Sequence, residues 1–200
     1  MLFGEVPALP VVAPVTAVAL GVLLWRLQRR GALSPLRAVV AVCVCIYGAG
    51  VVANTIFPIF LDKPGGTPPW SSSISMTLFD DYELSDAIQN VVVFIPLGVL
   101  LPLIAGTRSL WRVAGLGVLL SLLIETAQFF SDHFLDGGHV ADINDFFFNA
   151  VGAPVGYGIF MMATRTPILA RLADRMSWPS TRAVNQGEAR GRAGASRSRV

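Results

Sequence analysis

Five long apolar runs dominate this chain and limit what it can fold into. A helix needs about 20 apolar residues to cross the hydrocarbon core of a bilayer. Of the 200 residues, 54% are hydrophobic and 14% are charged, whereas ordinary soluble domains carry about 25% charged residues. We therefore expect an all-α, polytopic transmembrane helix bundle of about five spans, with the lipid bilayer as its surroundings. The expected spans are residues 7–25, 36–61, 86–105, 113–130 and 142–164.

The basic residues are distributed unevenly between the runs. Arginines follow the first run, separate the third from the fourth, and recur beyond residue 165, while acidic residues gather in segments 62–86 and 132–145. Basic residues concentrate in cytoplasmic loops of membrane proteins, so we expect the N-terminus outside and the C-terminus in the cytoplasm. Residues 1–7 contain no basic residue, which argues against a cleavable signal peptide.

Turn and cap residues mark further boundaries. Ser34-Pro35 is typical of a helix start, and Pro58 is expected to bend the outer end of the second span. Residues 62–85 are predicted to form an exposed loop, and the fourth span is predicted to break at Ser131-Asp132. Residues 167–176 are expected to form a short interfacial helix.

The chain is predicted to have three parts. Residues 1–85 form two helices and an outer loop, and residues 86–164 form a three-helix membrane domain. Residues 165–200 form a basic cytoplasmic tail, which is disordered from about residue 178.

Within the third to fifth runs, polar residues recur at helical spacing and define the candidate site. Ionisable groups at membrane depth are costly and mark functional positions. At a rise of 1.5 Å per residue, the innermost of them lie ~6 to 8 Å below the expected outer boundary. We therefore predict a polar crevice open to the outer surface. The candidate residues are Asn90, Glu125, Gln128, His139, Asp142, Asp145 and Asn149.

A purely structural interpretation explains part of this cluster. The amides can form hydrogen bonds between helices, and Asp142 and Asp145 can cap the fifth helix. Glu125 lies within an apolar run and needs a proton or a partner, for which His139 is the nearest candidate cation. The acids and His139 match no specific ligand spacing, so we expect no metal. We also expect no cofactor, and the sequence has no nucleic-acid-binding signature.

The order of short segments around these residues resembles the VanZ-like family of bacterial membrane proteins. The segments are NVVVFIPLG at 90–98, SLLIETAQ at 121–128, ADIND at 141–145 and NAVGAPVGY at 149–157. The resemblance implies a multi-pass protein of the bacterial inner membrane, in some members linked to resistance to teicoplanin, a glycopeptide antibiotic that attacks cell-wall precursors. The family usually has Arg where this chain has His139, so His139 would replace that charge only when protonated.

Three functions fit these observations. The first is a non-enzymatic membrane protein whose crevice recognises an antibiotic or a molecule of the cell envelope, such as a cell-wall precursor. The second is an enzyme acting on a lipid-linked envelope precursor, with Glu125 or Asp145 as general base; the chain lacks the common hydrolase, metalloprotease and phosphate-loop motifs. The third is a structural or partner-binding protein in which the polar residues only specify helix packing.

Overall fold

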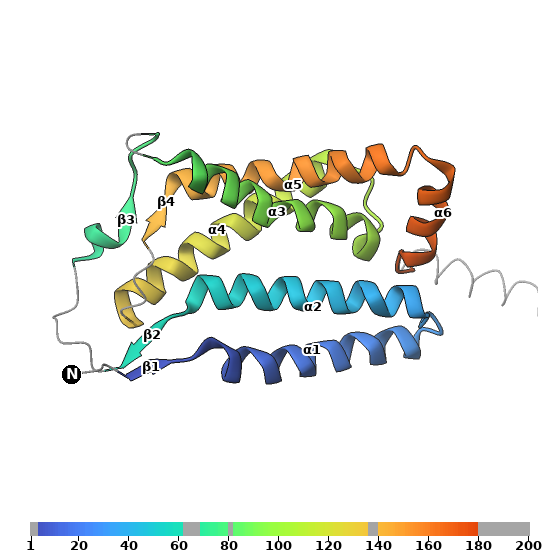
Figure 1. The fold of residues 1–200 in the computed structure, drawn as a ribbon, viewed down its shortest axis with the longest axis horizontal. Coiled ribbons are helices and arrows are strands. Elements are labelled where there is room, and N and C mark those ends of the chain that lie inside the picture. Colours follow the sequence, from blue (N-terminus) through green and yellow to red (C-terminus); the bar gives the residue numbers. More distant parts are fainter. Residues whose placement is uncertain (1–3, 62–68, 80–81, 136–139, 180–200) are drawn as a thin grey trace, which may run out of the picture.

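The chain folds into a bundle of long helices (Figure 1). The structure, a computed structural model, describes residues 4–61, 69–79, 82–135 and 140–179. Among these residues, five helices are long and apolar enough to cross a membrane, which confirms the predicted fold class. They are α1 (Ala8–Arg29), α2 (Pro35–Ile56), α3 (Leu84–Ala105), α4 (Leu110–Leu135) and α5 (Ile143–Ala163).

Helices α3, α4 and α5 form the tightest part of the bundle, with α5 packed most extensively on α3. The core contains Phe94, Leu101, Val113, Ala153 and Tyr157. Glycines let the two backbones meet: a Cβ atom built on Gly156 would lie 2.1 Å from the Ile95 carbonyl oxygen. Small residues allow such close approach where no hydrophobic effect drives helices together in lipid. The predicted packing role of this glycine is thus confirmed.

Helices α1 and α2 form a peripheral hairpin along one side of the bundle (Figure 1). Ser34 caps α2 as predicted, because its Oγ accepts a hydrogen bond from the Arg37 amide at 3.4 Å. At the other end, strands β1 (Gly4–Val6) and β2 (Ile59–Leu61) pair antiparallel. The apolar surface of α1 is largely exposed, as expected of a helix that faces lipid.

Two predicted helix ends are wrong. Helix α2 stops at Ile56, five residues earlier than predicted, and Phe57 is extended with φ −105° and ψ 150°. A residue before proline disfavours the helical region, so Pro58 follows the helix and does not bend it. Helix α4 continues to Leu135. Instead of breaking it, Ser131 donates its hydroxyl to the Ile56 carbonyl oxygen at 3.0 Å.

The predicted loop at 62–85 is mostly exposed in its described residues, and it also contains short secondary structure. It contains a 3₁₀ turn, η1 (Trp70–Ser73), followed by strand β3 (Ile74–Ser75). Strand β3 pairs in parallel with β4 (Ala141–Asp142), immediately before α5, and Ser73 is fully buried. Local turn signals do not reveal this pairing, because the paired residues lie 67 positions apart in the sequence.

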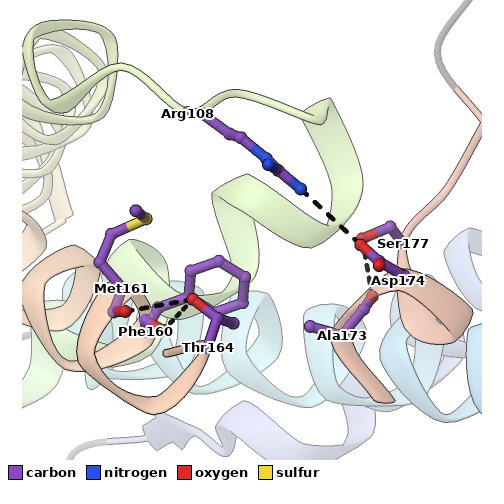
Figure 2. Close-up of polar contacts among 7 residues, drawn as sticks. All are labelled: Arg108, Phe160, Met161, Thr164, Ala173, Asp174 and Ser177. Atoms are coloured by element: carbon purple, nitrogen blue, oxygen red, sulfur yellow. Dashed lines mark hydrogen bonds and ion pairs between the residues drawn. The ribbon is translucent and has the colours of Figure 1, made fainter. Parts of the chain in front are cut away.

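The short helix predicted after α5 is present as α6 (Pro167–Met176). Figure 2 shows Arg108, from the α3–α4 connection, directed at Asp174 of α6 across 3.7 Å. Just beyond α6, Ser177 accepts a hydrogen bond from Arg37 at 2.8 Å through its carbonyl oxygen. The arginines of the described residues thus lie at one end of the bundle, where α1, α3 and α5 end (Figure 1). Which side of the membrane this end faces remains a prediction.

We expect Gly156→Ala to destabilise the bundle by about 1–3 kcal/mol, the range for forcing an extra methyl group into a packed interior. The added Cβ would meet the Ile95 backbone, which cannot move aside as a side chain can. The measurement is reversible unfolding of the purified protein in mixed micelles, followed by circular dichroism. Gly158→Ala is the matched control, since a Cβ there meets nothing within 4 Å. Equal stability of the two variants would contradict the proposed close contact.

Candidate functional site

A polar cluster lies in the half of the bundle away from the arginine-rich end, where α3 and α5 begin. Its centre is Asp145 in the first turn of α5. One oxygen of this carboxyl, Oδ1, accepts hydrogen bonds from the Asn90 amide at 2.6 Å and from the Tyr82 hydroxyl at 2.5 Å. The Asn90 amide also donates to the Tyr82 oxygen at 2.9 Å. The three side chains form a closed network between α5, α3 and the segment before α3.

Tyr82 is held in this network by its ring as well as by its hydroxyl. The ring stacks on Phe148 with centroids 5.6 Å apart. Burial, reinforced by the hydrogen bond donated to Asp145, raises the pKa of the Tyr82 phenol above its usual value. The raised pKa favours the protonated phenol, which is the form that donates to Asp145.

Glu125 connects α4 to the start of α5. Its Oε2 accepts a hydrogen bond from the backbone N–H of Asp142 at 2.9 Å. The predicted need for a partner is thus met, on one oxygen, by the backbone. The side chain is only 8% exposed, and its other oxygen, Oε1, has no hydrogen-bond partner among the described residues. Leaving a buried acceptor unsatisfied is costly, so this oxygen needs an explanation beyond helix packing.

Asp142 is the N-cap of α5, as predicted in the structural interpretation. Its Oδ1 accepts hydrogen bonds from the Asn144 backbone at 2.7 Å and from the Asn144 side chain at 2.9 Å. Asn144 is buried and continues the network, accepting from the Phe79 amide at 2.9 Å and donating to the Thr77 carbonyl at 2.8 Å. These bonds fasten the segment before α3 onto the start of α5.

A cavity of about 300 Å³ lies next to the cluster, between α2, α3, α4 and α5. Besides Glu125 Oε1, the buried oxygens of Gln128 (Oε1) and Tyr47 (Oη) have no hydrogen-bond partner in the part of the chain that the structure describes. Helix α2 supplies a wall that the sequence interpretation did not foresee. The polar residues of the lining are Tyr47, Asn54, Thr55, Gln89, Asn90, Glu125, Gln128, Asp145 and Asn149.

Five of the seven predicted site residues therefore line one cavity: Asn90, Glu125, Gln128, Asp145 and Asn149. Asp142 contacts them through its backbone, while its Oδ1 is committed to Asn144. His139 lies outside the residues that the structure describes. Asp86, four residues before Asn90 on α3, is exposed and absent from the lining.

Two members of the network, Tyr82 and Asn144, were missed by the sequence interpretation. Asn144 lies within the ADIND segment, two residues after Asp142, and the predicted cap at Asp142 is the signal that could have identified it. Tyr82 follows two aspartates in an acidic segment, and no local pattern distinguishes it. Among the described residues, no group of three or more His, Cys, Asp or Glu side chains is placed to hold a metal ion.

One comparison with known proteins finds a match, and this match includes the segments that build the cluster. No curated protein matches the chain, and no solved structure matches it. The family model described as VanZ/LLP1 matches residues 51–164, a stretch that begins in α2 and ends just after α5. This stretch covers more than half of the chain and includes every described residue of the cavity lining except Ile46, Tyr47 and Gly50. The chain therefore belongs to the VanZ/LLP1 family.

Proposed function

We propose that this VanZ-like membrane protein recognises a molecule of the bacterial cell envelope, or an antibiotic that acts there, through the cavity between α2 and α5. The observation that carries the proposal is the set of buried oxygens on Glu125, Gln128 and Tyr47 that have no hydrogen-bond partner among the described residues. Buried polar groups are normally satisfied, and here they border a cavity of about 300 Å³. A ligand that supplies hydrogen-bond donors would satisfy them.

The proposed location is the bacterial inner membrane, with the arginine-rich end in the cytoplasm. The positive-inside bias supports this orientation, since the described arginines gather where α1, α3 and α5 end. The cavity lies in the opposite half of the bundle and would then open toward the outer leaflet. Cell-wall precursors and the glycopeptides that bind them act on that side, which supports a contribution to teicoplanin-type resistance.

The three predicted parts of the chain take roles in this proposal. Residues 86–164 supply the tightly packed helices and most of the cavity, whereas residues 1–85 add the wall that contains Tyr47. The segment after residue 165 begins with α6, which is tied to the α3–α4 connection by Arg108 and Asp174. Residues 180–200, predicted to form the disordered part of the tail, lie outside the described residues.

One observation favours a second candidate, an enzyme acting on a lipid-linked envelope precursor. Glu125 has a free oxygen at the cavity, which is the arrangement that a general base needs to reach a substrate proton. Retained function in Glu125→Gln would argue against an enzyme, because this variant keeps the shape of the side chain and loses the base. An enzyme would lose its activity in this variant. A purely structural protein would tolerate both Glu125→Gln and Asp142→Asn.

Expression of the chain in a teicoplanin-sensitive bacterial host is expected to raise the minimal inhibitory concentration of teicoplanin several-fold. Glu125→Ala should abolish the increase, because it removes the free cavity oxygen and the bond to the Asp142 amide. Asp86→Ala is the matched control, since this carboxyl is exposed and away from the cavity. Unchanged susceptibility on expressing the wild-type chain, at normal membrane levels, would remove the resistance proposal.

Orientation is tested by labelling single cysteines in intact cells with a membrane-impermeant maleimide. In a background with Cys43 and Cys45 replaced by Ala, we expect Ser85→Cys to be labelled and Arg171→Cys to be labelled only after permeabilisation. Both positions are exposed and lie at opposite ends of the bundle. The reverse pattern would place the cavity on the cytoplasmic side and refute an outward-facing site.

A further inference from the structure

We propose that the cavity binds a protonated amine, an inference that rests on the proposed recognition function and names the ligand chemistry. The lining carries two carboxyl groups, those of Glu125 and Asp145, and among the described residues it contains no Arg, Lys or His. The one ion pair among those residues joins Arg108 to Asp174, at the far end of the bundle. The acids therefore have no cationic partner from the described part of the chain. An anionic ligand would be repelled here.

The unsatisfied oxygens match the donors of an ammonium group. Glu125 and Gln128 are 8% and 9% exposed and line the cavity, and the Oε1 of each has no hydrogen-bond partner among the described residues. The Tyr47 hydroxyl has no partner in that part of the chain either, and Tyr47 lines the same cavity. A primary ammonium brings three N–H donors and one positive charge. The ammonium group therefore supplies hydrogen-bond donors to the unpartnered oxygens and a positive charge to the carboxyl groups.

The size of the cavity indicates which kind of molecule bears the amine. About 300 Å³ is at the lower limit for small-molecule pockets, so the cavity holds an amine-bearing group and not a whole glycopeptide. Glu125 also lines a neighbouring, mainly apolar cavity of about 400 Å³, together with Leu122, Phe129 and Phe146. An amine attached to an apolar chain fits this arrangement. Two sources present that chemistry: a free amphiphilic amine, or the ethanolamine headgroup of a phospholipid.

The first arm of the test compares n-hexylamine with 1-hexanol, which has nearly the same shape but no charge. The full chain is placed in nanodiscs of phosphatidylcholine, whose trimethylated headgroup has no N–H donor, and thermal unfolding is followed by circular dichroism. A ligand that binds the folded state raises the apparent unfolding temperature. We expect hexylamine to raise it by a few degrees more than hexanol.

Matched variants assign this shift to the cavity. Glu125→Gln keeps a carbonyl oxygen for the Asp142 amide and removes the charge, so the hexylamine-specific shift should disappear. Asp86→Asn removes an exposed carboxyl elsewhere on α3 and should leave the shift intact. Equal shifts with hexylamine and hexanol, or a full shift in Glu125→Gln, would overturn the proposal. If Glu125→Gln does not fold, Asp145→Asn provides the same comparison at the second carboxyl.

The second arm distinguishes the sources. When phosphatidylethanolamine replaces part of the phosphatidylcholine, a lipid-headgroup ligand would stabilise the protein by itself and reduce the added effect of hexylamine. An unchanged hexylamine shift would assign the site to a free amine. The teicoplanin assay is a separate readout: a Glu125-dependent amine shift with no effect on susceptibility would refute the resistance proposal alone. Resistance without an amine-specific shift would refute the amine site alone.

Discussion

The close backbone contact between α3 and α5 is the constraint on which the candidate site depends. Gly152 and Gly156 let α5 approach the carbonyl oxygens of Val91 and Ile95, and this approach brings Asn90 within 2.6 Å of Asp145. A larger residue at either glycine would push the two helices apart, because its Cβ would meet the Val91 or Ile95 carbonyl oxygen. In a bilayer, a polar group separated from its partner finds no water to replace it. The hydrogen bond between Asn90 and Asp145 therefore depends on the close packing of α5 on α3.

The start of α5 is fixed in a second way, by polar contacts to segments on either side. Glu125 of α4 accepts from the Asp142 backbone, and Asp142 in turn caps the helix through Asn144. Asn144 then holds the strand segment before α3. One Glu125 oxygen thus stabilises the fold, while the other has no hydrogen-bond partner among the described residues. This division explains how a carboxyl in an apolar helix can be both structurally anchored and available to a ligand.

The helical spans and most of the cluster could be predicted from the sequence, because apolar run length and helical spacing are local properties. The same spacing placed Asn90, Glu125, Gln128, Asp145 and Asn149 on inward faces, where the structure has them around one cavity. Predictions failed where distant segments decide the structure. Ser131 was interpreted as a helix break because its partner, the Ile56 carbonyl, lies 75 residues away. Tyr82 was missed because its bond to Asp145 spans 63 residues.

The helices that form the walls of the cavity differ in how tightly they pack against their neighbours. Helices α3 and α5 are locked together by glycine contacts, whereas α2, which carries Tyr47, packs more sparsely against α3 and α4. Regions with fewer packed contacts open at lower free energy. A ligand that enters between the helices would therefore displace α2 more readily than it would separate α3 from α5. The tightly packed part of the bundle then serves to hold Glu125 and Asp145 in place, while the peripheral hairpin adapts to the size of the group that binds them.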